Sequence, residues 1–141
     1  MVQGPGRAVL VTGASSGLGL EVARRLAARG WAVGLMSRDT ARLNAALSEI
    51  SGSGASLVAC PGDASNPDDC AKAVEQMKQV AGGLNALVCC AGISLRSTVE
   101  DTTAPVAEAV MRANFWTVFH STQAALELVT DRKSTRLNSS H

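Results

Sequence analysis

The sequence has no tyrosine among its 141 residues, so no phenol of this chain can act as a general acid or base. It also has few charges. With 18% charged residues and a formal net charge of +1, it is neither a disordered polyelectrolyte nor a basic nucleic-acid-binding domain. The longest uncharged stretch, 79–95, is broken by three glycines and an asparagine, so it does not provide the roughly 18 apolar residues of a membrane span. We expect one soluble domain with neither nucleic acid nor membrane as a partner.

The four cysteines do not form a C-x-x-C pair, and Met1 to Arg7 lack the apolar core of a signal peptide. By default we expect reduced thiols and a cytoplasmic location. Cys89 and Cys90 are adjacent in an apolar run, where successive side chains point to opposite faces. We expect them to be buried by packing, and we expect no metal site.

Along the chain, short continuous apolar runs alternate with segments in which apolar residues recur at about every fourth position. Strands are expected at 8–11, 31–36, 56–60 and 86–91. Helices are expected after the first three strands, and a last helix from about 105 to 129. The third helix has the clearest start, with Asn66 as N-cap and Pro67 at the first helical position, and Gly82-Gly83 end it. This alternation predicts an α/β fold with right-handed βαβ units and a parallel sheet.

The last eleven residues, 131–141, break the pattern because they are polar and aperiodic. They match an in-frame translation of a common sequencing-adapter string, codon by codon. We expect residues 1–130 to form the domain and 131–141 to be a non-native scar. The alternative is a natural polar tail.

A glycine-rich segment, Thr12-Gly13-Ala14-Ser15-Ser16-Gly17-Leu18-Gly19, lies between the first expected strand and helix. In such a position Gly13 permits a tight turn, Gly17 lets the backbone approach phosphates, and Gly19 allows close packing of the helix. Free N–H groups at the helix start face an anion, and Ser15 and Ser16 add hydroxyl donors. The segment predicts a pyrophosphate cradle. A flexible glycine-containing loop is the alternative.

These residues resemble the short-chain dehydrogenase/reductase family, whose fingerprint T-G-x-x-x-G-x-G is matched at Thr12, Gly13, Gly17 and Gly19. Further matches follow at Asp63, at Ala91-Gly92 and at Asn114, so the resemblance extends from Arg7 to about Val129. It implies a Rossmann-like, doubly wound parallel sheet, here truncated to four strands in the order 3-2-1-4. It also implies a nicotinamide cofactor, with Leu18 and Cys90 beside the glycines as further contacts.

Cofactor choice depends on the residues after the second strand. An acidic residue there binds the ribose 2′-hydroxyl of NAD, whereas Ser37-Arg38 favours the 2′-phosphate of NADP. Arg38 as a solvated surface residue is the alternative, and neighbouring Asp39 offers a carboxylate one place later. The resemblance implies that Asp63 holds the adenine amino group; otherwise it caps the loop before Asn66. Ala91 and Gly92 are expected beside the nicotinamide ribose.

The family usually has Asn-Asn where this chain has Cys89-Cys90, so amide hydrogen bonds that brace the central strand are lost. Asn114 lies in an otherwise apolar helix, where an amide needs a partner. The resemblance implies that it organises a water in a proton relay to a catalytic lysine. A satisfied buried amide is the alternative.

The family's hydride transfer uses a Ser, a Tyr and a Lys four residues after the Tyr, all beyond the last helix of this sequence. We therefore expect the front half of a reductase that transfers hydride between NADP(H) and a carbonyl or secondary alcohol. On its own the chain should be inactive, and the complete protein should be a homo-oligomer with a small-molecule substrate. One alternative is a catalytically inactive nucleotide-binding or regulatory module. Another is a methyltransferase of Rossmann class, although that class predicts an acidic residue where Ser37-Arg38 stands.

Overall fold

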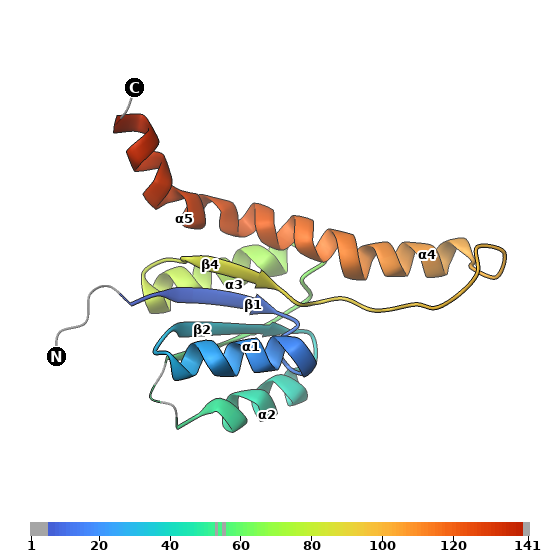
Figure 1. Ribbon diagram of the computed structural model, residues 1–141, viewed down its shortest axis with the longest axis horizontal. Helices are drawn as coiled ribbons and strands as arrows, with labels where there is room; N and C mark the ends of the chain where they lie inside the picture. Colours follow the sequence, from blue (N-terminus) through green and yellow to red (C-terminus); the bar gives the residue numbers. More distant parts are fainter. Residues whose placement is uncertain (1–5, 53, 55, 140–141) are drawn as a thin grey trace.

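A computed structural model describes the backbone of residues 6–52, 54 and 56–139, and the side chains of these residues up to Thr130. Strands and helices alternate along the chain (Figure 1). The strands are β1 (Ala8–Thr12), β2 (Ala32–Ser37), β3 (Leu57–Pro61) and β4 (Ala86–Cys89). The helices are α1 (Gly17–Ala28), α2 (Thr40–Ile50), α3 (Pro67–Ala81), α4 (Ala104–Met111), the π-helical segment η1 (Arg112–Trp116) and α5 (Thr117–Ser139).

The four strands form one parallel sheet in the order β3-β2-β1-β4, which confirms the predicted strand order. β1 pairs with β2 on one side, with Val9 opposite Val33, and with β4 on the other, with Leu10 opposite Leu87. Since all strands run the same way, their carboxyl ends meet at one edge of the sheet. Segments that follow different strands are thereby brought together there.

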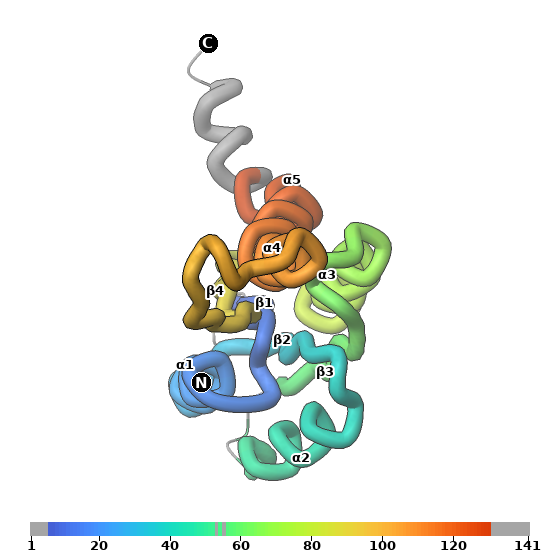
Figure 2. The backbone as a smooth tube through the Cα atoms, turned by 90° about the vertical axis from the view of Figure 1, so that its right-hand side faces the viewer, coloured from blue at the N-terminus to red at the C-terminus, as the bar shows by residue number. Residues whose placement is uncertain are grey.

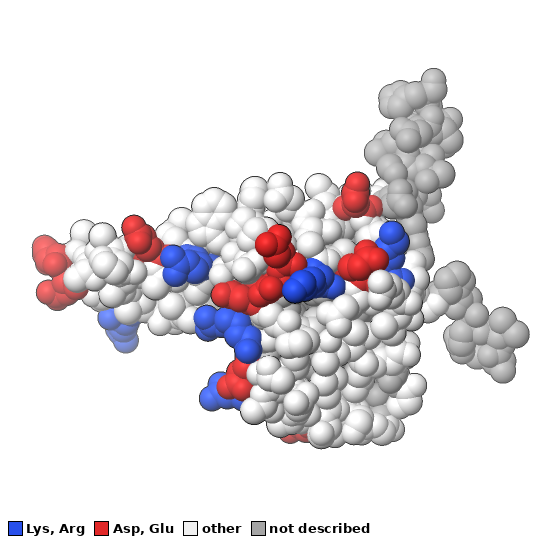
Figure 3. Space-filling model, turned by 180° about the vertical axis from the view of Figure 1, so that it is seen from behind, with Lys and Arg blue, Asp and Glu red and all other residues white. Residues whose placement is uncertain are grey.

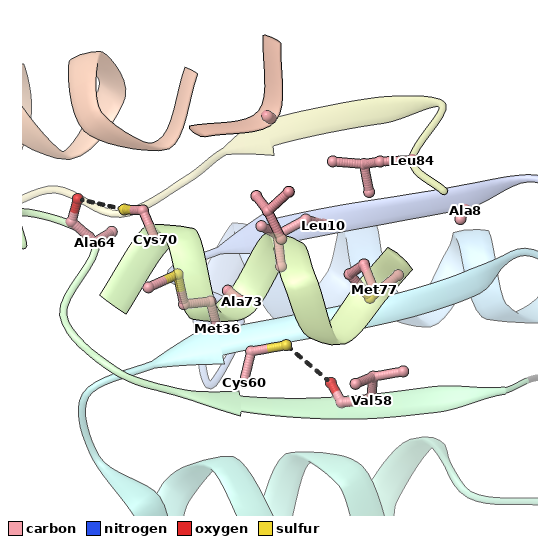
Figure 4. Close-up of a cluster of buried hydrophobic side chains, with 12 residues drawn as sticks. Ala8, Leu10, Met36, Val58, Cys60, Ala64, Cys70, Ala73, Met77 and Leu84 are labelled. Carbon is pink, nitrogen blue, oxygen red and sulfur yellow. Dashed lines mark hydrogen bonds between the residues drawn. The ribbon is translucent and has the colours of Figure 1, made fainter. Parts of the chain in front are cut away.

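Helices cover both faces of the sheet. Because side chains alternate along each strand, each strand contributes side chains to both faces. Figure 2 shows α1 and α2 on one face and α3 with α4 and α5 on the other. Val9 and Val11 of β1 pack toward α1 and α2, whereas Leu10 packs toward α3 and α5. Leu10, Met36 and Met77 belong to the cluster of buried side chains between the sheet and α3 (Figure 4). This double covering explains why the central strands read as continuous apolar runs.

Gly34 of β2 leaves space for α3 on the face of the sheet that α3 covers. A Cβ at Gly34 of β2 would lie 2.5 Å from the Met77 sulfur of α3 and 3.1 Å from Leu10 Cδ1. The sheet and α3 therefore approach each other more closely here than a side chain at position 34 would permit.

The predicted ends of α3 are confirmed. The Asn66 side chain accepts hydrogen bonds from the backbone N–H groups of Asp68 and Asp69, and Pro67 is the first helical residue. Gly82 ends the helix in the left-handed conformation, with a φ of 76°. Both ends follow from local chemistry that is visible in the sequence.

The last helix differs from the expected range of about 105 to 129. Helical backbone begins at Ala104 and continues to Ser139, past the point where apolar periodicity stops. It also contains the π-helical turn η1, which the sequence analysis did not predict. α4 has no buried residues, because it extends past the carboxyl ends of the strands (Figure 1). None of the described helices is both long and apolar enough to span a membrane.

The expected burial of Cys89 is wrong. Cys89 is exposed and Cys90 is half-buried, whereas Cys60 and Cys70 are buried; all four thiols are free. The physical reason is that β4 pairs only with β1 in the described sheet, so it is an edge strand. The other residues of β4 are likewise only half-buried.

Candidate functional site

A cleft of about 750 Å³ lies at the carboxyl edge of the sheet. Its walls come from segments that follow all four strands and from the start of η1. The residues predicted from sequence that line it are Gly13, Ser15, Ser37, Arg38, Asp63, Ala91 and Gly92. In open parallel sheets, this edge is where ligands bind.

Gly13 forms the turn that follows β1. Its φ of 63° lies in the left-handed region, and a Cβ there would lie 2.6 Å from the backbone nitrogen of Ala91. A side chain would therefore meet the segment after β4. Gly19 is equally confined, because its Cβ would overlap the Gly13 carbonyl oxygen. Gly19 thus allows α1 to pack closely against the turn that precedes it.

The first turn of α1 is open toward the solvent. Its N-cap, Ser16, makes no side-chain capping hydrogen bond, and the turn contains no acidic residue. A Cβ at Gly17 would point into open space, and Leu18 is 74% exposed. Ser16 borders a second cavity of about 550 Å³, which shares Ser15 and Arg42 with the cleft. N–H groups at such a helix start can receive an anion.

Thr12 holds the ends of β1 and β4 together. It is completely buried, and its hydroxyl oxygen accepts hydrogen bonds from the backbone N–H groups of Cys90 and Ala91 at 3.2 and 3.3 Å. The Cys89 sulfur lies 3.6 Å from the Ser121 hydroxyl, and Cys90 packs against the α1–α2 side of the sheet. The strand end lacking the two amides is therefore braced by a threonine. Cys90, predicted as a cofactor contact, is not among the described residues that line the cleft.

A polar corner of the cleft is formed where β2 ends. The Ser37 hydroxyl donates to the Ser15 hydroxyl at 2.8 Å, and Arg38 and Arg42 lie beside them in the cleft wall. Asp39 also lines the cleft, but its carboxylate caps α2 by accepting from the Arg42 N–H at 3.0 Å. The same carboxylate lies 3.7 Å from Arg42 Nε. The corner therefore combines two hydroxyls and two guanidinium groups.

Asp63 follows β3 and faces the same cleft. Its Oδ1 accepts hydrogen bonds from the N–H and the hydroxyl of Ser65, at 2.8 and 2.7 Å. Burial raises the pKa of Asp63, but the Ser65 hydrogen bonds and the charges of Arg38 and Arg112 lower it, and the net pKa lies below its usual value. Asp63 thus carries a negative charge at the cleft while also holding its own loop.

Asn114 lies within η1 and is exposed, so the alternative of a satisfied buried amide is wrong about the burial, although both polar groups of the amide have partners. Its side-chain nitrogen donates to the Ile93 carbonyl at 2.8 Å, and its oxygen accepts from the Ile93 N–H at 2.9 Å. A Cβ at Gly92 would lie 2.5 Å from that oxygen, which accounts for the glycine. The amide therefore clamps the segment after β4 to the helix. Single π turns inside α-helices are frequent at functional sites.

Three further residues line the cleft although they belong to no motif of the sequence: Arg42, Ser65 and Arg112. A signal existed for Arg42, because it follows the cap residue Asp39 by three positions and so lies in the first turn of α2. Arg112 gives no such signal. It reaches the cleft because the long helix crosses over the carboxyl edge of the sheet, and this crossing is a tertiary feature.

Charges of both signs are mixed on the molecular surface. Figure 3 shows acidic and basic side chains together in a band across the middle of one face, and most of the remaining face carries neither. At the cleft itself, the basic side chains that could hold an anion are the arginines of its lining, Arg38, Arg42 and Arg112.

Comparisons with known proteins agree with this geometry. A family model described as short chain dehydrogenase matches residues 7–137. The chain is 39% identical over 126 residues to 11-beta-hydroxysteroid dehydrogenase 1A of Arabidopsis thaliana, covering 86% of this chain and 35% of that protein. A solved dehydrogenase/reductase from Sinorhizobium meliloti superposes with a TM-score of 0.83 at 34% identity, covering 88% of this chain and 50% of the other.

A variant of actinorhodin polyketide ketoreductase, solved with NADPH, superposes with a TM-score of 0.86 at 26% identity. The match covers 95% of this chain and 51% of that one. The chain thus spans about half the length of the structures that it matches and about a third of the first relative.

Proposed function

The chain belongs to the short-chain dehydrogenase family, and from this premise we propose that its cleft holds NADP(H) for hydride transfer to or from a carbonyl or secondary alcohol. The observation that carries the proposal is the convergence of the glycine turn, the serine–arginine corner and Asp63 on one cleft. The three features match the pyrophosphate, the 2′-phosphate and the adenine of one dinucleotide.

Two arginines support NADP over NAD. Arg38 and Arg42 lie in the same corner as the Ser15 and Ser37 hydroxyls, and together they form a donor set for a phosphate. Asp39 is the residue that would favour NAD. Its carboxylate is instead engaged by the start of α2 and by Arg42, so its charge is partly compensated. The NADPH found in the ketoreductase neighbour is consistent with this choice.

Two residues that do not themselves line the cleft hold one of its walls in place. Thr12 and Asn114 fix the backbone from Cys90 to Ile93, where the nicotinamide ribose is expected. When bound, the cofactor would supply or accept the hydride. Because the chain has no tyrosine, the proposal assigns the proton donor to residues outside this sequence. In this proposal Asn114 is a positioning residue, because its amide fixes the backbone at Ile93.

The decisive experiment is a calorimetric titration of the chain with NADPH and, separately, with NADH. We expect tighter binding of NADPH, and we expect Arg38→Asp to reverse the order, because a carboxylate repels the 2′-phosphate. The contact is worth on the order of 1–3 kcal/mol, or about 5- to 150-fold in affinity.

Arg29→Asp, an exposed charge reversal at the end of α1, is the matched control and should leave the preference unchanged. Equal affinities for the two cofactors in the unmutated chain would refute the NADP assignment.

A catalytically inactive nucleotide-binding module is the second candidate, favoured by the absence of tyrosine. The two functions differ in the coding sequence downstream of Thr130. An enzyme requires a further strand ending in Ser, followed by Tyr-x-x-x-Lys, and a regulatory module does not.

A further inference from the structure

Asp63 shares the cleft with two arginines that come from different parts of the fold. Arg38 follows β2 and leads into α2, whereas Arg112 opens η1, which covers the other face of the sheet. Both arginines line the cleft with Asp63, and both of their charges lower its pKa. The acidic end of the cleft therefore has a basic side chain on each wall.

Apart from Arg112 itself and the buried Thr117, the wall that carries Arg112 is apolar. The helix presents Ala109 and Ala113 to the cleft, and Ile93 lies beside them. The hydroxyl and guanidinium donors suited to a phosphate are at the opposite corner, around Ser37. Small apolar side chains with one planar cation form a surface for an aromatic ring rather than for a phosphate.

Arg112 is free to take such a ligand. It is exposed, and none of the side-chain hydrogen bonds or ion pairs among the described residues involves it. Arg24, Arg25 and Arg42, by contrast, are each held by a carboxylate.

We propose that Arg112 is a further cofactor-binding residue, which places its guanidinium against the face of the adenine while Asp63 faces the edge of the ring. The inference rests on the proposed function, because it requires the adenine to lie beside Asp63. It assigns to Arg112 a contact that NADH, NADPH and adenosine 5′-monophosphate all make. Arg38, in contrast, discriminates between the two dinucleotides.

The test compares Arg112→Ala and Arg112→Lys with the unmutated chain in titrations with adenosine 5′-monophosphate, NADH and NADPH. Arg112→Ala should weaken all three by the same factor, about 3- to 10-fold. Arg112→Lys keeps the charge but loses the planar group, so it should recover only part of the affinity.

Arg96→Ala is the matched control. Arg96 is an exposed arginine outside the cleft, so its loss changes the net charge equally and should leave all three affinities unchanged. Circular dichroism of each variant checks that the fold is retained.

Unchanged affinities in Arg112→Ala would overturn the inference. So would a loss confined to NADPH, which would make Arg112 a phosphate ligand. If Arg38→Asp reverses the cofactor preference while Arg112→Ala has no effect, the proposed function stands and the role of Arg112 falls. If the unmutated chain binds none of the three ligands, both fall.

Discussion

Two buried thiols lie near α3. Cys60 lies on β3 beneath the helix, and Cys70 lies near the start of the helix itself. The Cys60 thiol donates to the Val58 carbonyl and the Cys70 thiol to the Ala64 carbonyl (Figure 4). Burial raises the pKa of both thiols to about 11, with the nearby Asp69 and Asp63 charges adding to the rise at Cys70. Such thiols are poor nucleophiles at neutral pH, because the thiolate is the reactive form.

The raised pKa values predict a loss of stability in alkali. Below pH 9 both thiols are protonated in the folded and unfolded chains, so their contribution is fully present. Between pH 9 and 11 the unfolded chain releases protons that the folded chain retains, and unfolding becomes easier by roughly 1–2 kcal/mol per thiol. Urea denaturation under reducing conditions, at several values between pH 8 and 11, measures this change.

The Cys60→Ala, Cys70→Ala double variant is the control. Both proteins contain the same lysines, whose titration affects the two equally. The double variant should therefore lose the part of the pH dependence that comes from the two thiols. The same slope in variant and unmutated chain would contradict the assignment to these thiols.

At the scale of elements, one amide side chain ties each end of the sheet. Asn114 holds Ile93 beyond the carboxyl end of β4, and Asn85 accepts a hydrogen bond from the Ala8 N–H at 2.8 Å at the opposite end. Each is a local clamp between segments distant in sequence. Removing either should loosen its own partner and leave the other unaffected.

We therefore expect Asn114→Ala to speed hydrogen exchange at the Ile93 amide by about 5- to 10-fold, the loss of roughly one hydrogen bond. Asn85→Ala should do the same at Ala8 and should spare Ile93. Exchange measured by NMR on both variants gives this crossed comparison. Equal acceleration at both amides in either variant would show a global rather than a local effect.

The elements themselves were largely predictable from sequence, because their signals are local. The N-cap at Asn66, the glycine that ends α3 and the apolar strands all depend on neighbours within a few residues. The π turn at Asn114 and the exposure of Cys89 depend on distant packing and on which strands flank β4. Arg112 was missed for the same reason, because its place in the cleft follows from the path of the whole helix.

At the scale of the whole molecule, the proposed function needs a proton donor, and this sequence has no tyrosine to act as one. We expect the purified chain to show no carbonyl reductase activity, because general acid catalysis contributes about 10²–10⁴-fold and a positioned donor is missing. Oxidation of NADPH with a broad panel of ketones measures this. Turnover that persists after contaminating reductases have been excluded would show that the active site has been misread.

An apolar stripe along η1 and α5 also concerns the whole molecule. Phe115, Val118, Phe119 and Leu126 are each 42–53% exposed, and β4 beside them has an unpaired edge in the described sheet. Exposed apolar surface next to free strand backbone favours association. We expect the chain to self-associate or aggregate in sedimentation experiments.

The Phe115→Lys, Phe119→Lys double variant should reduce this association. Val99→Lys, in the loop before α4, is the control and should not, although Val99 is 92% exposed. A monodisperse monomer with strong exchange protection at Leu87 and Val88 would contradict the prediction and would favour the regulatory-module function.

The pairing of β4 with β1 has a consequence for the order of events during synthesis. β1, β2 and β3 are neighbours in the order in which they leave the ribosome, so they can pair as soon as each emerges. The other edge of β1 must wait until residue 86 and beyond have been made, and Thr12 has no partner at Cys90 and Ala91 until then. The glycine turn is complete early, but its contact with Ala91 forms late. A nascent chain stalled before β4 has emerged should therefore fail to bind the cofactor, whereas a chain stalled after β4 has emerged should bind it.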